Sequence, residues 1–570
     1  MRMHYPRTPH LPWSPGATSD DVRTGDLSHL VGREVVVTEK LDGENTTLYA
    51  DGLHARSLDS AHHPSRTWVK ALHSRIAHGI PSGWRICGEN VYARHSVPYD
   101  RLDGYFYGFS VWDAQGRCLD WDRTVLFLRG LGVPSPAVLW RGVFDERALR
   151  ALRLDLSRQE GYVVRAAKGF AAADFRHSVA KWVRAGHVQT DTHWMHSAVV
   201  PNGLGPAAAL WSVRSGGPAH PEQLAGALGV RASASYGPVA EVAERSGRTG
   251  DARLTAVLAA LLHGEHRSTL AAGLRPVLGM RLARRVADVV GLAPGLHRPY
   301  PDADRRTGLI RLSYAADLDV LHSVAAALAR TDEEREQVEW SALYADEVRA
   351  WKPPRFDELA PDAADRCRAE ARDAYAEGRI AGPEEATAAT WRWRDGDFPR
   401  LVQMVGPSGS GKSTFAHGLG ADTVVSLDDL REAAGSRADQ RGNGDVLRAG
   451  LDRLDRALAA GGTVVWDATS INRHQRALVH KVARRRNALT THAIVVLDEG
   501  QLRRRNAGRA HAVPDGVLES QLRRYEPPYP GQAHRTWYIG SDGTIEDTHG
   551  DGNGDGNRDG KGDGNGHADE

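Results

Sequence analysis

The sequence predicts a multidomain α/β protein with a helical middle region, and three observations lead to this prediction. Over residues 1–204, short β-like apolar runs alternate with loops and a few helices. Alanine- and leucine-rich helical periodicity follows over residues 205–345. Farther on, the apolar run Leu401–Val405 leads directly into a glycine-rich loop, the order expected of a buried strand that feeds a helix. At 570 residues the chain has room for about three or four domains, each with its own core.

Charge and hydropathy limit the function classes. The net charge is only +1, so a nucleic-acid surface would have to be local. No apolar run is long enough to span a membrane, and the start Met1–Pro6 does not resemble a secretory signal, so we expect a cytoplasmic protein without membrane partners. The three cysteines, Cys87, Cys118 and Cys367, are too scattered for a disulfide framework or a zinc pattern.

Lysine is rare in this chain, which makes each lysine informative. Of 73 basic residues only eight are lysine. Arginine keeps its proton in proteins, whereas a desolvated lysine amine can lose it and act as a nucleophile. Lys40 follows the apolar run Val35–Val37, which predicts a strand, and Asp42-Gly43 predicts a turn that presents it. Taken alone, this pattern also fits an ordinary turn at the end of a strand.

The stretch Thr38–Asn45 resembles motif I of the covalent nucleotidyltransferases, which include ATP-dependent RNA and DNA ligases and capping enzymes. Four further stretches follow in that family's order and rough spacing: Gly88–Tyr92, Phe106–Asp113, Glu160–Arg165 and Ala180–Arg184. The resemblance implies a mixed α/β nucleotidyltransferase domain of ATP-grasp-like type over residues 1–204. It also implies that Lys40 attacks the α-phosphate of ATP and forms a lysyl-AMP.

The same resemblance assigns roles to several other residues. It implies that Glu89 contacts the ribose, that Phe106 and Phe109 lie in the motif that stacks on adenine, that Glu160 engages the metal and that Lys181 grips phosphates. Glu39 is also expected in the ATP site, although any of the three glutamates taken singly could be a solvated strand acid. Arg56 meets either the departing pyrophosphate or an RNA 5′-phosphate, and a solvated surface arginine is an equally good interpretation.

The helical region 205–345 gives a weaker signal. DNA ligases and capping enzymes continue into a β-rich OB-fold at this point, and we find none here, which favours an RNA ligase. The segments Leu254–His266 and Leu312–Asp319 faintly resemble the core helices of HD phosphohydrolases, but Gly264 stands where the metal-binding aspartate should be. A ligase-associated helical domain with incidental histidines is the preferred interpretation. Residues 346–397 are polar, are interrupted by prolines and predict a connector that contains a helix.

A second nucleotide site is predicted in the domain at 398–540. The stretch Gly406–Thr414 fits the phosphate-binding P-loop pattern G-x-x-x-x-G-K-[ST] between a strand and a helix. Backbone N–H groups of such a loop wrap a β-phosphate, Lys412 reaches the β- and γ-phosphates and Ser413 ligates Mg²⁺. The residues predicted to bind ATP here are Gly406, Ser408, Gly409, Ser410, Gly411, Lys412, Ser413 and Thr414.

The residues after the P-loop resemble the phage-type 5′-hydroxyl polynucleotide kinases. Val424–Arg431 is a second predicted strand with acids at its end, and the resemblance implies that Asp428 takes the proton from the 5′-OH and that Arg431 binds the acceptor's 3′-phosphate. Asp467, after a third strand, is expected near the metal or the acceptor. Arg505 and Arg509 belong to a stretch that resembles the lid of this family. Phosphoryl transfer needs mostly positioning and neutralised charge, which such a set supplies.

The segment 541–570 is rich in Gly, Asp and Asn and is predicted to be a disordered tail. Its D-G-N repeats suggest calcium, but they lack the acid that ends an EF-hand loop, so calcium is disfavoured.

Together the two enzymatic ends predict an RNA repair enzyme that uses ATP with Mg²⁺ or Mn²⁺. Its partners would be RNA with 5′-OH or 5′-phosphate ends and 3′-OH ends. Two alternatives stay open: a small-molecule kinase joined to an inactive ligase-like domain that binds nucleic acid, and a regulatory ATPase with a scaffold role.

Overall fold

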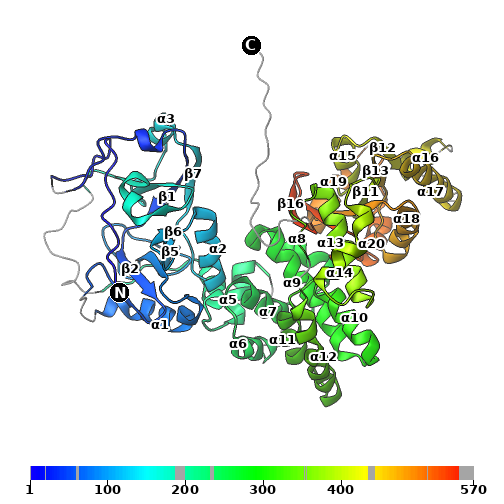
Figure 1. Ribbon diagram of the computed structural model, residues 1–570, viewed down its shortest axis with the longest axis horizontal. Coiled ribbons are helices and arrows are strands. Elements are labelled where there is room, and N and C mark those ends of the chain that lie inside the picture. The colour runs from blue at the N-terminus through cyan, green and yellow to red at the C-terminus, as the bar shows by residue number, and fades with distance from the viewer. Residues whose placement is uncertain are drawn as a thin grey trace, which may run out of the picture. The chain divides into compact units, whose positions relative to one another are not determined.

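The computed structural model describes residues 2–19, 21–58, 63–186, 199–230, 237–351, 354, 356–433, 435, 443–509 and 511–550. The chain divides into two compact units, Met1–Leu261 and Leu262–Glu570 (Figure 1). The boundary falls inside the segment 205–345 that the sequence predicts as one helical domain. The helices of that segment are therefore shared between the two units.

The first unit contains two antiparallel sheets. The first sheet has four strands in the order β10 (Val179–Val183), β8 (Gly161–Ala166), β1 (Glu34–Lys40) and β7 (Val138–Val143). The second has six in the order β3 (Gly52–His54), β2 (Glu44–Tyr49), β4 (Arg85–Asn90), β5 (Phe106–Trp112), β6 (Arg117–Cys118) and β9 (Phe170–Ala171). Because β1 and β2 follow each other in the chain but belong to different sheets, the turn between them lies where the two sheets meet.

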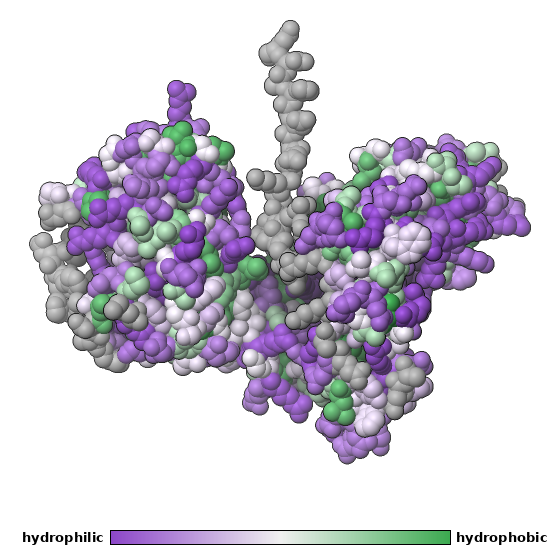
Figure 2. Space-filling model, viewed as in Figure 1, coloured by the Kyte–Doolittle hydropathy of each residue, from purple (hydrophilic) through white to green (hydrophobic). Residues whose placement is uncertain are grey.

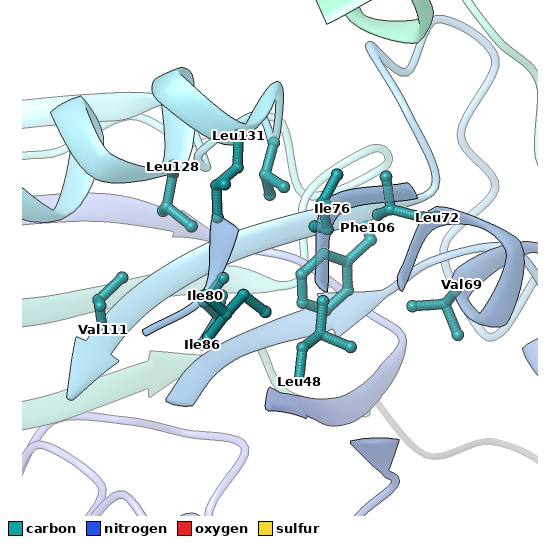
Figure 3. Close-up of a cluster of buried hydrophobic side chains, with 11 residues drawn as sticks. Leu48, Val69, Leu72, Ile76, Ile80, Ile86, Phe106, Val111, Leu128 and Leu131 are labelled. Atoms are coloured by element: carbon teal, nitrogen blue, oxygen red, sulfur yellow. The ribbon is translucent and has the colours of Figure 1, made fainter. Parts of the chain in front are cut away.

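The six-stranded sheet is covered on one face by α1 (Thr67–Ile76) and α2 (Trp121–Leu131). Leu48, Ile86 and Phe106 of the sheet pack with Leu72 and Leu128 of these helices in a fully buried cluster (Figure 3). Apolar residues on one face of each strand and one stripe of each helix make this core. The unit's remaining short elements are α3 (Glu146–Arg150) and the 3₁₀ helices Ser28–Leu30, Pro64–Arg66, Ala77–Gly79 and Ala172–His177.

Four helices of the predicted middle domain belong to the first unit: α4 (Ala208–Arg214), α5 (Pro221–Leu228), α6 (Gly237–Arg245) and α7 (Gly250–Leu261). Asp251 at the start of α7 accepts hydrogen bonds of 2.7 Å from Arg214 of α4 and of 2.7 Å from Arg129 of α2. This pairing ties the helices to the body of the first unit.

The second unit is built on a sheet in the order β12 (Thr423–Ser426), β13 (Thr463–Asp467), β11 (Arg400–Val405), β14 (Leu489–Val495), β15 (Arg535–Ile539) and β16 (Ile545–His549). The first five strands are parallel and β16 is antiparallel. The helices that follow the strands are α15 (Lys412–Gly418), α16 (Leu427–Ala433), α17 (Asn443–Ala459), α18 (Arg473–Arg485), α19 (Glu499–Ala507) and α20 (Asp515–Arg523). The P-loop therefore follows a central strand, as predicted.

The other helices of this unit are α8 (Arg267–Leu278), α9 (Met280–Leu292), α10 (Asp302–Leu312), α11 (Leu318–Leu328), α12 (Asp332–Ala350), α13 (Pro361–Ala376) and α14 (Pro383–Ala389), with 3₁₀ helices at Ala293–His297 and Trp391–Trp393. Met280 of α9 packs with Val405 and Ile494 of the sheet, and Cys367 of α13 packs with Leu489. The segment 346–397, predicted as a connector, thus contributes packed helices to the sheet's surroundings.

The strand β16 corrects the predicted start of the tail. Residues 545–549 pair with β15, although the sequence predicts disorder from 541. Glu546 and Asp547 of this strand form ion pairs with Arg275 of α8 and Arg284 of α9. A low-complexity composition hides these contacts because their partners lie about 270 residues earlier in the chain. Residues 551–570, with the D-G-N repeats, lie outside the described residues.

Hydrophilic residues dominate the viewed surface, with hydrophobic residues scattered in small groups (Figure 2). No helix in the described part of the chain combines the length and apolar character needed to cross a membrane.

Candidate active sites

The first site is organised around Lys40, the last residue of β1. In the sheet register Lys40 lies opposite Gly161, and Thr38 lies opposite Val163, which in turn lies opposite Lys181 of β10. Alternate residues of a strand share a face and paired residues lie side by side, so Lys40 and Lys181 lie on one face of the sheet. The turn after Lys40 requires glycine, because a Cβ at Gly43 would lie 2.5 Å from the carbonyl oxygen of Asn90.

Glu160, just before β8, forms an ion pair with the Nζ of Lys40. The Glu160 side chain is only 2% exposed and that of Lys40 is 22% exposed. Burial alone would lower the pKa of Lys40, but the carboxylates of Glu160 and Glu89 raise it. The structure thus holds Lys40 as an ammonium ion beside the acid that the sequence assigns to a metal.

Glu89 lies on β4, opposite Asn45 of β2, and shares this site. Burial, together with the negative charges of Glu160 and Asp42, raises the pKa of Glu89 to about 8, although Lys40 opposes the shift. Asp42, in the turn after Lys40, accepts hydrogen bonds from the backbone N–H of Val97 and the hydroxyl of Ser96. Strands from both sheets therefore bring acids to one lysine.

The two predicted adenine-stacking residues lie in different places. Phe106 is completely buried in the cluster beneath α1 and α2, with no face left for a base (Figure 3). Phe109 is only partly buried and packs against a different buried cluster, which includes Cys87 of β4, with its ring edge-on to Tyr5 at 5.2 Å between centroids. The difference arises because β5 alternates its side chains between two faces and has an irregularity opposite Cys87 and Gly88. Phe106 is therefore a core residue, and Phe109 stays the candidate.

The remaining predicted residues of this site are spread around Lys40. Glu39 lies one residue earlier on β1, where burial raises its pKa against a hydrogen bond from Gln159. Burial and the charge of Lys40 lower the pKa of Lys181, and Arg56 lowers it further. Arg56 itself is exposed, just after β3. Lys40 and Arg56 are thus near enough to Lys181 to lower its pKa, a suitable arrangement for binding phosphates.

The P-loop has the backbone that its glycines allow. Gly406, Gly409 and Gly411 have φ of 151°, 82° and 98°, in the region that side chains disfavour. Lys412 is buried, and its Nζ donates to the carbonyl of Pro407 at 2.7 Å and the hydroxyl of Ser410 at 3.4 Å. Burial lowers the pKa of Lys412 to about 8. Thr414, Gly411 and Ser408 complete the predicted loop, and the N–H of Ser408 donates to Gln521 of α20 at 2.8 Å.

A hydroxyl and a carboxylate meet beside this loop. Asp467 ends β13 and is hydrogen-bonded to Ser413; burial raises its pKa, while Ser413 and Lys412 lower it. Oxygen ligands of this kind suit Mg²⁺, which in P-loop enzymes is held by the loop's Ser or Thr and by an acid at the end of a nearby strand. The pair Ser413 and Asp467 fits a divalent metal, as the sequence suggests.

Asp428 and Arg431, the predicted base and acceptor-binding residue, lie one turn apart on α16. Their side chains pair at 2.5 Å, and Asp428 is 55% exposed. Asp428 is close enough to Lys412 and Asp467 to affect the pKa of each. The predicted base, paired with the predicted acceptor-binding arginine, therefore lies near the charged residues beside the P-loop.

The predicted lid residues approach the P-loop: Arg505 from α19 and Arg509 from just after the end of that helix. Arg505 Nη1 donates to the carbonyl of Ser410 at 3.4 Å, and the charge of Arg509 lowers the pKa of Lys412. Asn506, which the sequence did not single out, fixes this lid: its Nδ2 donates to Val513 O at 2.7 Å and its Oδ1 accepts from Val513 N at 3.0 Å. Its burial inside an arginine-rich helix has no simple sequence signal.

The faint HD resemblance finds no support in the geometry. Asp317 caps α11, and Asp319 pairs with Arg349. Among the described residues, which include His263 and His266, no group of three or more His, Cys, Asp or Glu side chains gathers as a metal site would need.

Two features define the class of the protein. A lysine lies beside acids where two sheets meet, and farther along the chain a strand, P-loop and helix are accompanied by lid arginines. The class is a nucleotidyltransferase-type domain joined to a kinase-type P-loop domain. Family models agree with this division. Residues 33–183 match the model described as RNA ligase, and residues 401–528 match the model described as AAA domain. These matches confirm the prediction of an RNA ligase-type domain followed by a kinase-type P-loop domain.

Comparison with solved structures gives partial matches. The structure of the Pnkp1/Rnl/Hen1 RNA repair complex matches at 22% identity with a TM-score of 0.21, over 23% of this chain and 49% of that one. A sugar kinase from Janibacter sp. matches at 23% identity with a TM-score of 0.20, over 25% and 86%. The Naegleria gruberi RNA ligase with PPi matches at 18% identity with a TM-score of 0.23, over 32% and 61%. The chain spans about half the length of the first of these. No curated protein matches the chain.

Proposed function

We propose that this chain is a bifunctional enzyme that heals and seals RNA ends. Its first unit would be an ATP-dependent RNA ligase that works through a lysyl-AMP at Lys40. Its second unit would be a 5′-hydroxyl polynucleotide kinase. The observation that carries the ligase half is the ion pair of Lys40 with Glu160, with Glu89 and Lys181 on the same site, inside the stretch that matches the RNA ligase model.

In the ligase reaction the Lys40 ammonium first loses its proton, because only the neutral amine carries the lone pair that attacks phosphorus. A divalent cation held by Glu160 would supply positive charge that lowers the pKa of Lys40. The amine then attacks the α-phosphate of ATP, the P–N bond forms and pyrophosphate leaves. The cations Lys181 and Arg56 would neutralise charge on the phosphates, and Glu89 and Phe109 would hold the nucleoside.

The adenylyl group then moves to RNA. The 5′-phosphate of one end attacks the lysyl-AMP, which releases Lys40 and leaves AMP on the RNA end. The 3′-OH of the other end attacks that 5′-phosphate, the phosphodiester bond forms and AMP leaves.

In the kinase reaction the P-loop would hold ATP with Lys412 on the β- and γ-phosphates. Ser413 and Asp467 would hold a magnesium or manganese ion, which offsets charge on the phosphates. The oxygen of the RNA 5′-OH would attack the γ-phosphate while Asp428 accepts the hydroxyl proton, and ADP would leave. Arg431 would bind the acceptor's phosphate, and Arg505 and Arg509 would clamp the nucleotide.

The two halves support each other chemically. The kinase would make the 5′-phosphate that a ligase must adenylylate, so both reactions would act in turn on one break. RNA is preferred over DNA because of the RNA ligase match and the motif resemblance. We expect the enzyme in the cytoplasm, where RNA, ATP and magnesium ions meet.

The ligase half is tested with α-labelled ATP and a divalent metal, followed by a denaturing gel. Wild type and Lys412→Ala are expected to retain label, and Lys40→Ala to lose it. No label on folded, AMP-free wild type refutes the ligase half.

The kinase half is tested with γ-labelled ATP and RNA carrying a 5′-OH. Wild type and Lys40→Ala are expected to label the RNA, whereas Lys412→Ala and Asp428→Ala are not. Transfer to a sugar or nucleotide instead of RNA favours the small-molecule kinase, and ATP hydrolysis without transfer favours the regulatory ATPase.

A further inference from the structure

An N-terminal run, residues 9–11, lies along the outer edge of β10, and residues 22–24 pair with it in turn. The N–H of Lys181 donates to the carbonyl of Pro9 at 2.9 Å, and the N–H of Leu11 donates to the carbonyl of Lys181 at 2.8 Å. A second run of the same segment joins this edge: the N–H of His10 donates to Val22 at 2.7 Å, and the N–H of Thr24 donates to His10 at 2.9 Å. Two single-residue bridges thus extend the four-stranded sheet beyond β10.

The register of these bridges is what matters for the site. His10 lies opposite Lys181, and Arg23 lies opposite His10. On the other side Lys181 lies opposite Val163, which lies opposite Thr38, two residues from Lys40 on β1. Directly paired residues share a face of a sheet, so the row from Thr38 to Arg23 belongs to the face that carries Lys40. Arg23 and His10 therefore continue the line of Lys40 and Lys181.

The ring of His10 is held in place. It is 2% exposed, and its Nδ1 lies 2.9 Å from the hydroxyl of Ser14. Its Nε2 lies 3.5 Å from Asp21 Oδ2, beyond a good hydrogen bond, and has no hydrogen-bond partner among the described residues. Asp21 is itself fixed by the N–H and hydroxyl of Thr18 at 3.1 and 3.0 Å. Such a buried polar atom calls for a partner.

The charges around this row point to an anion. Burial and the cations Lys181, Arg23 and Lys40 together lower the pKa of His10 to about 4, against the opposing effect of Asp21. Burial and Lys40 likewise lower the pKa of Lys181. Cations that depress each other's pKa values in this way are stabilised by an incoming negative group, and a phosphate is the negative group that the ligase reaction supplies.

We propose that His10 and Arg23 complete a phosphate subsite of the ligase centre, in which Arg23 contacts the phosphate and His10 is a positioning residue that holds Arg23 and Lys181 in line. The phosphate would come from the pyrophosphate portion of ATP or from the 5′ end of RNA, which share this chemistry. The inference rests on the proposed ligase function for its substrates.

The test uses the full chain in a Lys412→Ala background, so that the kinase site does not bind ATP. One arm measures KM for ATP and the rate of lysyl-AMP formation. A second arm mixes AMP-loaded enzyme with 5′-phosphorylated RNA and follows transfer of AMP. A third arm measures binding of inorganic pyrophosphate by calorimetry, which needs no catalysis.

We expect Arg23→Ala to change the quantity measured in one of the first two arms by roughly tenfold: either a higher KM for ATP or a slower transfer of AMP to RNA. A tenfold loss is typical of one charge-assisted contact, and Arg23→Lys should lose less. A change in KM and in pyrophosphate affinity identifies the ATP phosphates, whereas a change confined to the RNA arm identifies the RNA end. His10→Ala should impair the same measured quantity as Arg23→Ala. His10→Asn can keep the hydrogen bond to Ser14 and should restore part of the loss seen in His10→Ala. Arg123→Ala, at an exposed arginine of α2, is the control and should change nothing.

Unchanged behaviour of Arg23→Ala in all three arms overturns the subsite, whatever His10→Ala does to folding. If wild type forms no lysyl-AMP at all, the proposed ligase function fails. Binding alone then decides on the subsite: a loss of affinity of Arg23→Ala for pyrophosphate or for 5′-phosphorylated RNA supports it, and equal affinity for both overturns it.

Discussion

Asp251 gives the sharpest test of how the helices are assigned to the two units. Its carboxylate joins Arg214 of α4 and Arg129 of α2, each at 2.7 Å. If α7 belongs to the ligase unit, Asp251→Ala destabilises that unit and leaves the P-loop unit unchanged.

The size of the effect follows from burial. Arg214 is 6% exposed, so removing its partner leaves a buried, unpaired charge, which costs about 3 kcal/mol. Arg129 is 42% exposed, and water screens its pair to roughly 0–0.5 kcal/mol. For a unit of this size, about 3 kcal/mol corresponds to a fall in Tm of roughly 6–12 °C.

The effect should depend on pH in one direction. Burial alone would raise the pKa of Asp251, but Arg214 and Arg129 lower it below its usual value. A carboxylate with a depressed folded pKa stabilises the protein above the unfolded pKa of about 3.9, and the stabilisation is lost as pH falls through the folded pKa. The difference between wild type and Asp251→Ala should therefore be constant from about pH 5 to 8 and shrink below about pH 4.

The assay follows thermal inactivation of lysyl-AMP formation and of kinase activity in the same full-length sample. Glu146→Ala, which breaks an exposed pair with Arg150, is the control and should shift neither. Equal shifts for Asp251→Ala and Glu146→Ala, or a shift in the kinase activity alone, would refute the assignment of α7.

Three other changes test the strand β16, the lid contact of Asn506 and the close packing at Gly88. A chain that ends at Gly540 loses β16 and leaves Arg284 buried without Asp547, so we expect the P-loop unit to lose about 3–5 kcal/mol in chemical denaturation. Asn506→Ala removes both bonds to Val513, and we expect kinase kcat/KM to fall roughly tenfold with lysyl-AMP formation unchanged. Gly88→Ala places a Cβ 2.4 Å from the Phe106 ring and should cost the ligase unit about 1–3 kcal/mol, measured by urea unfolding.

Each of these has a matched control. A chain that ends at Gly550 keeps β16 and the contacts of Asp547, and stability equal to that of the shorter chain would contradict the role of β16. Asn506→Asp keeps the acceptor for Val513 N and should lose less than Asn506→Ala. Gly226→Ala, on α5 with no atom within 4 Å of the added Cβ, should not lower the free energy of unfolding of the ligase unit. If it lowered it as much as Gly88→Ala, the contact with Phe106 would not explain the effect of Gly88→Ala.

The sequence predicted the elements whose signals are local. The strand before Lys40 and the strand, P-loop and helix around Lys412 follow from apolar runs and glycines that lie next to one another in the chain. Asp467 at the end of β13 also lies near the P-loop, as does Asp428, which the structure places on α16 just after β12 and not on the predicted strand, because parallel strands bring their carboxyl ends to one edge.

What the sequence could not predict depends on distant partners. Phe106 and Phe109 lie in one motif but on opposite faces of β5, and the packing of α1 and α2 on one of these faces decides that Phe106 enters the core. The strand β16 depends on arginines of α8 and α9, and the role of His10 depends on an edge pairing with β10. The N-terminal run Tyr5–Trp13, dense in proline and aromatic residues, was the available signal of a packed segment.

The two key lysines show why charge state belongs to the site and not to the residue type. Carboxylates raise the pKa of Lys40, whereas burial lowers that of Lys412 to about 8. The proposed roles need shifts in the opposite directions: a lower pKa that frees a neutral amine at Lys40, and a higher pKa that secures the cation at Lys412. Nucleotide phosphates at the P-loop would raise the pKa of Lys412, and a divalent cation beside Glu160 would lower that of Lys40. Each substrate complex would thus drive its own lysine into the required state, so the protein need not hold a reactive amine before ATP arrives.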